Sequence, residues 1–138
     1  MIEQINFRLR SRSRGFHIVT EEIVSALPDL TNVRAGMCNL FLQHTSASLA
    51  INENADPTVR VDLESFVNRL IPDGSSWLKH ITEGDDDMPA HIKAVVIGPS
   101  LVIPISNGRL ALGTWQGIYL CEHRDRGGAR SIVATIFS

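Results

Sequence analysis

The sequence predicts a single α+β domain, residues 1–138, in which two to three helices accompany a mostly antiparallel β-sheet or sandwich. The first observation behind this prediction is the length of 138 residues, which suits one hydrophobic core and is too short for a (β/α)₈ barrel of roughly 200 residues or more. The second is an apolar content of 43% and a charged content of 20%, as in ordinary globular proteins. The third is that strand-like segments outnumber helix-like ones and gather toward the C-terminus, which favours an antiparallel sheet.

Charge and hydropathy argue against two classes of partner. The formal net charge is −2, which gives no reason to expect nucleic acid or an anionic membrane as a partner. No apolar run approaches the ~20 residues of a membrane-spanning helix, and the N-terminus lacks the basic start and apolar stretch of a signal peptide. Cys38 and Cys121 lie in apolar, strand-like runs and are expected to be buried free thiols. We therefore expect a cytoplasmic protein.

The chain opens with a strand and a short helix. Residues 3–14 alternate apolar and polar side chains, which predicts a strand whose arginines share one face. That basic face is either a solvated outer surface or a wall that collects anions, because the guanidinium suits phosphate. Residues 20–27 predict a helix that Thr20 caps and Pro28 ends.

Two strands and a longer helix follow. Residues 36–43 alternate, and their mostly apolar row continues to His44. Residues 46–53 predict the next strand, which has one face of small and polar side chains that leaves room for a ligand or for close packing. This face carries Ser46, Ser48, Ala50 and Asn52. Asp56 as N-cap and a continuous apolar stripe then predict a helix over residues 57–70.

A second dense polar stretch, residues 77–94, precedes the C-terminal strands. Asp86 or Asp87 is expected to cap a helix that begins near Met88. His91 then lies near the positive end of that helix. This position disfavours the imidazolium and leaves a neutral nitrogen free to bind a metal ion or to accept a proton.

The C-terminal third predicts only β-structure. Asn107-Gly108 is a strong signal for a two-residue hairpin turn. Further along, Glu122 ends an inward-facing row, as His44 does on its own strand. The four predicted strands are residues 100–106, 109–112, 114–123 and 129–137.

Histidines at the ends of these elements suggest a metal site. His44, His80 and His91 each stand beside acids or amides. If they converge, three imidazoles suit zinc or a similar divalent ion with one open coordination position. No His-x-His or His-x-x-x-His pair is present, so the tertiary fold has to bring them together.

Two acids and one aromatic residue are further candidates. Glu83 and Glu122 are possible acid–base carboxylates, since burial beside apolar rows would raise the pKa of each toward the useful range. For Glu83 the alternative is a solvated loop acid, and for Glu122 it is an ion pair with Arg124 or Arg126. Trp115 could stack on a planar ring, or belong to the core or to a subunit interface.

Three segments of the chain match motifs of a known family. They are HTSASLAINENADPTVRVD at 44–62, EGDDDMPAHIK at 83–93 and GRLALGTWQGIYLCEHR at 108–124. On the basis of these three segments, the sequence resembles the YjbQ family, also called secondary thiamine-phosphate synthase. The resemblance covers nearly the whole length of the chain. One place departs from the pattern: many relatives have an asparagine in the acidic segment where this chain has Asp85-Asp86-Asp87.

The resemblance implies a compact α+β fold and a homotrimer with sites close to the subunit interfaces. It also implies metal and anion binding near His44, His80 and His91, with Glu83 and Glu122 beside them. The activity attached to the family is thiamine-phosphate synthesis, as a main or a side activity. In that reaction a hydroxymethylpyrimidine diphosphate joins a thiazole phosphate, and pyrophosphate leaves.

From the resemblance and the residue chemistry together, we expect a transferase that acts on these small phosphorylated metabolites with a divalent metal ion, zinc or magnesium. His44, Glu83 and Glu122 are the candidate catalytic residues, and His44, His80 and His91 are the candidate metal ligands. The candidate substrate-binding residues are Asn52, Lys93, Arg109, Trp115, Gln116 and Arg124. Two alternatives stay open: a protein that binds a metal and a phosphorylated metabolite without turnover, and a phosphoester or diphosphate hydrolase.

Overall fold

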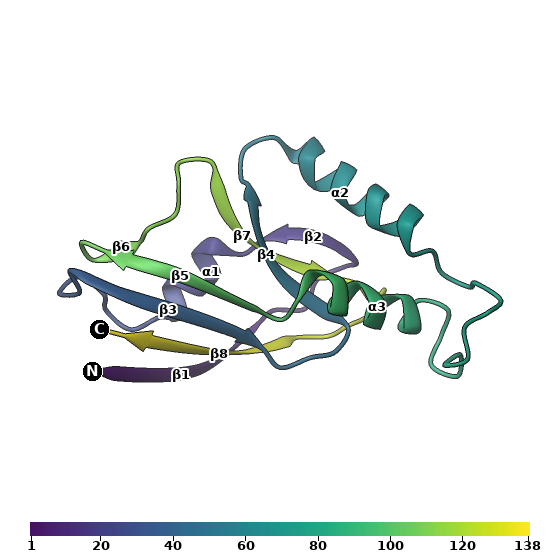
Figure 1. Ribbon diagram of the computed structural model, residues 1–138, viewed down its shortest axis with the longest axis horizontal. Coiled ribbons are helices and arrows are strands. Elements are labelled where there is room, and N and C mark those ends of the chain that lie inside the picture. The colour runs from purple at the N-terminus through teal and green to yellow at the C-terminus, as the bar shows by residue number, and fades with distance from the viewer.

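Eight strands and three helices make up the computed structural model, which describes residues 1–138 (Figure 1). The strands are β1 (Ile2–Leu9), β2 (Gly15–Ile18), β3 (Ala35–Leu42), β4 (Ala47–Glu53), β5 (Ser100–Ser106), β6 (Arg109–Leu110), β7 (Gln116–Glu122) and β8 (Arg130–Phe137). The helices are α1 (Thr20–Ala26), α2 (Pro57–Leu70) and α3 (Asp87–Ile97).

The strands form two separate antiparallel sheets. The five-stranded sheet has the order β1-β8-β3-β5-β6, and the three-stranded sheet has the order β2-β7-β4. Every pair of neighbouring strands is antiparallel. The predicted α+β class with a mostly antiparallel sheet is therefore confirmed.

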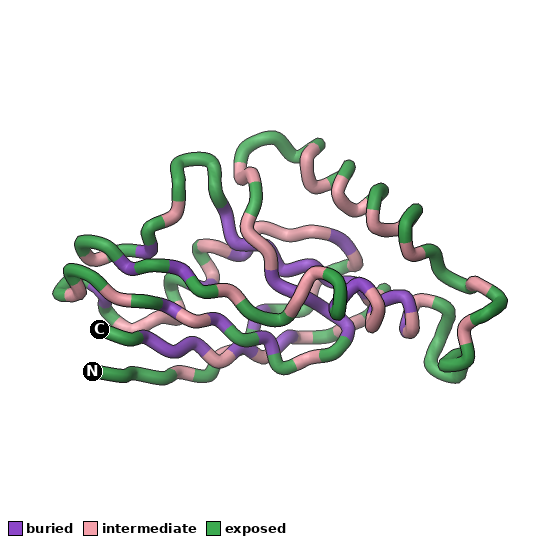
Figure 2. Tube along the Cα trace, in the orientation of Figure 1, coloured by how far each residue is buried: buried purple, intermediate pink, exposed green.

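The inward faces of the two sheets enclose the hydrophobic core. β3 shows the alternation that the sequence predicts: Cys38, Leu40 and Leu42 are buried, whereas Met37 and Phe41 are exposed. Figure 2 shows the buried positions concentrated along the strands, while the long helix α2 carries none. Both cysteines are buried free thiols, as expected.

The expectation of one strand over residues 3–14 is wrong. β1 pairs with β8, whereas β2 pairs with β7 in the other sheet, so the chain crosses between the sheets within this segment. The arginines of the crossing do not all share one face, because Arg10 and Arg12 both approach Glu22 whereas Arg14 is directed elsewhere. Arg12 pairs with Glu22, and Arg14 Nη1 lies 2.7 Å from Asp73 Oδ2. Alternation along the chain continues through such a crossing because it does not depend on which strand is the partner.

Two other local predictions are confirmed. The carboxylate of Asp56 accepts a hydrogen bond from the Thr58 backbone N–H at 2.9 Å and caps α2, with Pro57 at its first position. Asn107 and Gly108 both have positive φ, 50° and 84°, as the two central residues of a tight hairpin turn require.

Two helix caps and two strand ends differ from the prediction. Thr20 lies inside α1, and its hydroxyl accepts a hydrogen bond from the Ile118 backbone N–H of β7 at 2.9 Å, which ties the helix to the sheet. Asp86 precedes α3 without a side-chain capping bond, because its carboxylate is used elsewhere, as described below. Residues 111–115 leave the sheet, so β6 and β7 are shorter than expected.

The two longer helices differ in how they meet the sheets. α3 packs against β4, so its side chains reach the loop between β3 and β4. α2 packs against β2, at the edge of the three-stranded sheet, and none of its residues is buried (Figure 1). No helix combines the length and the apolar character that a membrane crossing requires.

Candidate metal site

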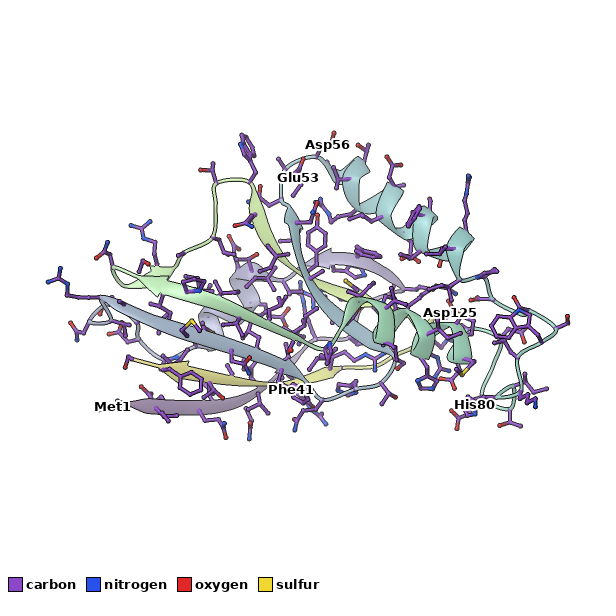
Figure 3. All side chains as sticks on the ribbon, viewed as in Figure 1. Met1, Phe41, Glu53, Asp56, His80 and Asp125 are labelled. Carbon is purple, nitrogen blue, oxygen red and sulfur yellow. The ribbon has the colours of Figure 1, made fainter.

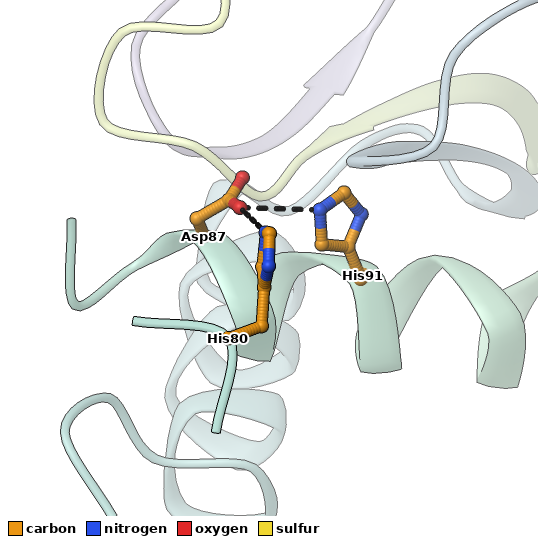
Figure 4. A group of neighbouring side chains, drawn as sticks. All are labelled: His80, Asp87 and His91. Carbon is orange, nitrogen blue, oxygen red and sulfur yellow. Dashed lines mark hydrogen bonds and ion pairs between the residues drawn. The ribbon is translucent and has the colours of Figure 1, made fainter. Parts of the chain in front are cut away.

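A histidine–aspartate cluster lies where the loop after α2 returns to the start of α3 (Figure 4). Asp87 and His91 are one helical turn apart on α3, so both side chains project from the same face. His80 Nε2 lies 2.8 Å from Asp87 Oδ2, and His91 Nε2 lies 3.2 Å from the same oxygen. The three potential ligand atoms are all within 4.8 Å of one another.

Asp87 is held in place by a buried ion pair. Its side chain is almost completely buried, and Oδ1 accepts a hydrogen bond from Arg124 Nη1 at 2.6 Å. Burial raises the pKa of Asp87, but the hydrogen bond with His80 and the electrostatic interactions with His91 and Arg124 outweigh it, and the resulting pKa is below the usual value. The carboxylate therefore stays ionised, with Oδ2 directed at the two histidines.

Arg124 also joins the cluster to the acidic loop before it. Its Nε donates to Asp86 Oδ2 at 2.9 Å, and its Nη2 donates to the backbone carbonyl of Glu83 at 3.0 Å. These contacts explain why Asp86 does not cap the helix. One guanidinium thus orients Asp87 and fixes the path of the loop that carries His80.

The hydrogen bonds of His91 identify its protonated nitrogen. Nδ1 lies 2.9 Å from the backbone carbonyl oxygen of Thr45, which accepts only, so Nδ1 carries a proton. A neutral imidazole has one N–H, and Nε2 is then a bare nitrogen that faces the Asp87 carboxylate. Two electron-rich groups in this position need a cation between them, either a proton that makes the imidazolium or a metal ion. A backbone carbonyl that orients a histidine in this way is typical of metal sites.

The third histidine of the prediction, His44, lies beside this cluster and outside it. Its Nε2 accepts a hydrogen bond from the Ser131 backbone N–H at 2.7 Å. His44 and His91 line one surface hollow of about 260 Å³, with Thr45 between them. Burial and the charge of Arg130 lower the pKa of His44, so its imidazole is neutral.

The two predicted acid–base carboxylates have different surroundings. Glu83 is exposed, and its Oε2 lies 3.7 Å from His80 Nε2, at the rim of the cluster. Glu122 is completely buried and forms a two-point ion pair with Arg130, whose Nε donates to Oε1 at 2.7 Å. The alternative expected for Glu122 was an ion pair with Arg124 or Arg126. Glu122 does form an ion pair, but with Arg130 instead.

Of the six predicted substrate-binding residues, only Arg124 lies at the cluster. Lys93 faces the other side of α3, and its Nζ donates to Asn68 Oδ1 at 2.7 Å. Arg109, Trp115 and Gln116 belong to β6, β7 and the loop between them. Glu53, the strand partner of Gln116, lies far from His80 in Figure 3. Asn52 is exposed and lines a groove under α2 that Lys93 also lines.

Sequence reasoning missed the role of Asp87, which it treated as a helix cap. The signal that could have found it is the four-residue spacing from Asp87 to His91 inside a predicted helix. That spacing places a carboxylate and an imidazole on one face, as in many helical metal sites.

One histidine, His123, is buried directly after the end of β7 without a charged partner. His123 Nε2 lies 2.8 Å from Ser48 Oγ, and Nδ1 has no hydrogen-bond partner. Burial, reinforced by the positive charges of Lys93 and Arg130, lowers the pKa of His123 to about 3. This histidine is therefore neutral in the folded protein throughout the physiological range.

Comparison with known proteins places this chain among close relatives. A sequence profile described as "UPF0047 protein YjbQ-like" matches residues 3–138. "UPF0047 protein YjbQ" of Escherichia coli O157:H7 is 53% identical over 133 residues, 96% of each chain. "UPF0047 protein YugU" of Bacillus subtilis is 34% identical, covering 88% of this chain and 89% of its own. A crystal structure of an uncharacterized conserved protein of the yjbq/upf0047 family from Clostridium acetobutylicum matches with a TM-score of 0.83 and 36% identity, over 96% of this chain and 99% of that one.

Replacing His123 should change how stability depends on pH. The unfolded chain binds a proton at an ordinary histidine pKa near 6.5, whereas folded His123 does so only near 3. The unfolded state thus holds the extra proton between these values, and stability falls as the pH drops from 6.5 toward 3. The slope from this residue is about 1 kcal/mol per pH unit. His123→Gln, which can still bond Ser48, should lose that part of the slope.

The measurement is urea unfolding of the wild type and of His123→Gln at pH 6.5, 5.5 and 4.5. His17→Gln serves as the control for loss of a histidine elsewhere. Equal slopes for His123→Gln and the wild type would show that His123 is not buried as a neutral residue.

Proposed function

This chain belongs to the UPF0047 family of YjbQ-like proteins, and with that premise we propose that His80, Asp87 and His91 bind a divalent metal ion used on a phosphorylated small molecule. Two imidazoles and one carboxylate match the ligands that zinc prefers, whereas magnesium prefers oxygen ligands only. Zinc is therefore the favoured ion of the two expected from the sequence. Three protein ligands leave a coordination position open to a substrate oxygen.

The observation that carries this proposal is the shared carboxylate oxygen. Oδ2 of Asp87 faces the Nε2 atoms of both histidines, and the Thr45 carbonyl already accepts the hydrogen bond from the Nδ1–H of His91. If only hydrogen bonds joined these groups, each of the two contacts with Oδ2 would need its own N–H donor, and His91 would have to carry a proton on both ring nitrogens. A cation at the centre of the three groups satisfies all of them, while Arg124 balances the other carboxylate oxygen.

We propose thiamine-phosphate synthesis, or a closely similar transfer, as the reaction. The bond between the pyrimidine methylene carbon and its diphosphate oxygen breaks, and a bond from that carbon to the thiazole nitrogen forms. A divalent ion would supply positive charge to the departing pyrophosphate. The family resemblance supports the choice of substrates, and the cluster supports the need for a cation next to a leaving anion.

The neighbouring residues suit an anionic substrate. His44 accepts a hydrogen bond at Nε2, so its single proton is on Nδ1, which can donate to a phosphate oxygen in the hollow shared with His91. Glu83 lies exposed next to His80 and can accept a proton at the rim of the site. Glu122 supports the site indirectly, since its pair with Arg130 leaves no free carboxylate oxygen.

We also propose that the protein is a homotrimer and that the site is completed by a neighbouring copy. The outer face of the five-stranded sheet carries an apolar patch of exposed side chains, here called the outer-sheet patch: Ile2, Met37, Phe41, Val102 and Phe137. Strand pairing places Met37 and Ile2 on either side of Phe137, so the patch is continuous across strands. Apolar patches of this kind are typical of subunit interfaces. A neighbouring copy could bring Arg109, Trp115 and Gln116 to the cluster.

Zinc binding should depend on the cluster. The wild-type protein, titrated with Zn²⁺ in a calorimeter after treatment with a chelator, should bind one ion per chain. His91→Ala removes one ligand and should weaken binding about 100-fold or more. His17→Ala removes a histidine whose ring bonds only the Ser13 carbonyl and should bind zinc as the wild type does. Equal binding by His91→Ala and the wild type would refute the assignment.

Product formation tests the reaction itself. Zinc-loaded protein mixed with both phosphorylated precursors should form thiamine phosphate and pyrophosphate, detected by chromatography. Asp87→Asn keeps the shape of the side chain but removes its charge, and should reduce the rate at least about ten-fold. Zinc binding with tight retention of a phosphorylated precursor but no product would indicate the binding protein instead. Release of inorganic phosphate or pyrophosphate without the thiazole would indicate the hydrolase.

The oligomeric state tests the outer-sheet patch. Phe41→Glu places a charge in the patch, and a buried unpaired carboxylate is costly, so the trimer should dissociate to monomers at micromolar concentration. Val61→Glu on the exposed side of α2 is the matched control and should stay trimeric. Size-exclusion chromatography with light scattering measures both. A wild-type monomer, or a trimer that survives Phe41→Glu, would contradict the proposed interface.

A further inference from the structure

A second candidate binding site lies on the opposite side of α3 from the metal cluster. A groove of about 300 Å³, here called the α2 groove, runs between α2, β4 and α3. Eleven of its thirteen lining residues are hydrophobic, and the two polar ones are Asn52 and Lys93. Lys93 and His91 are two positions apart on the helix, so they point in nearly opposite directions. The groove is therefore independent of the proposed metal chemistry.

The apolar wall of the groove is open to solvent. α2 has the stripe of apolar residues of a packed helix, yet Phe66 is 62% exposed and Leu70 is 60% exposed. The helix is held near its C-terminal end by Arg14, whose Nη2 donates to Asn68 Oδ1 at 2.9 Å and whose Nη1 pairs with Asp73. Polar contacts thus hold α2 in position while its apolar side remains uncovered.

Lys93 supplies a buried positive charge at this groove. The side chain is 1% exposed, and Nζ donates one hydrogen bond, to Asn68 Oδ1 at 2.7 Å. No carboxylate lies within 4.0 Å of Nζ, so the ammonium has no ion-pair partner and two of its three N–H donors are free. A buried ammonium without a counter-ion is costly, and burial lowers the pKa of Lys93.

We propose that the α2 groove binds an amphiphilic monocarboxylate, such as a medium-chain fatty acid, with its carboxylate on Lys93 Nζ and its alkyl chain along Phe66 and Leu70. The carboxylate supplies the single negative charge that the ammonium lacks. Among the more distant charges, Arg14 disfavours the ammonium and Glu64, Asp73 and Asp125 favour it; a singly charged carboxylate is repelled less by these three acids than a doubly charged phosphate would be. The volume of the groove is at the low end for ligand pockets, roughly 300–1,000 Å³, which suits a short chain.

Octanoate and octan-1-ol, which share a chain length and differ in charge, provide the test. Titration calorimetry with the full chain should show octanoate binding at least about ten-fold more tightly than octan-1-ol, the factor expected from one buried charge pair. Lys93→Met replaces the ammonium by an apolar group of similar length and should remove the preference for octanoate. Lys79→Met, a lysine outside the groove, is the matched control and should retain it.

A second variant keeps the test decisive if Lys93→Met does not fold, which circular dichroism will reveal. Phe66→Ala removes an exposed side chain from the groove wall and should weaken octanoate and octan-1-ol by similar factors. The proposal is overturned if octanoate fails to bind at millimolar concentration, or if it binds no better than octan-1-ol. It is also overturned if Phe66→Glu lowers the native mass, because a second copy of the chain then occupies the groove.

Discussion

The ion pair between Asp87 and Arg124 is the interaction on which the candidate site depends. Arg124 occupies one oxygen of the carboxylate, so the other is left to face His80 and His91. The same guanidinium binds Asp86 and the Glu83 carbonyl, which holds the loop in front of α3. Because Asp87 is buried, its charge is only weakly screened. Loss of either partner would leave a buried charge unpaired and would release the loop that carries His80.

α3 separates two chemical environments within one short helix. Its Asp87 and His91 face the loop between β3 and β4, where polar side chains gather at the end of the sheet. Its Lys93 faces the apolar space beneath α2. The helix can present such different faces because successive side chains are about 100° apart, so residues two positions apart diverge. The arrangement keeps the histidine–aspartate cluster and the buried ammonium of Lys93 on different sides of the helix.

The candidate site could be predicted from the sequence only in part. His80 and His91 were identified from their position in a dense polar stretch, and they meet. His44 was expected to join them, but its Nε2 bonds the Ser131 backbone, since the end of β3 lies beside the start of β8. Asp87 was treated as a cap. Its contact with His91 follows from their spacing on α3, whereas its contact with His80 depends on the return of the loop from α2. Glu122 was recognised as an inward-facing acid, but its partner Arg130 comes from the other sheet.

The sequence by itself determined the α+β class, the antiparallel strands, the capped helix α2 and the hairpin turn at Asn107-Gly108. These features follow from alternation, helical spacing and turn chemistry within a few residues of chain. Only the tertiary structure decided that residues 10–14 cross between two sheets, and that Asp87 lies between His80 and His91. Apart from the helical spacing of Asp87 and His91, such contacts join residues whose separation along the chain carries no periodic signal. They exist because strand pairing and loop paths bring distant segments together.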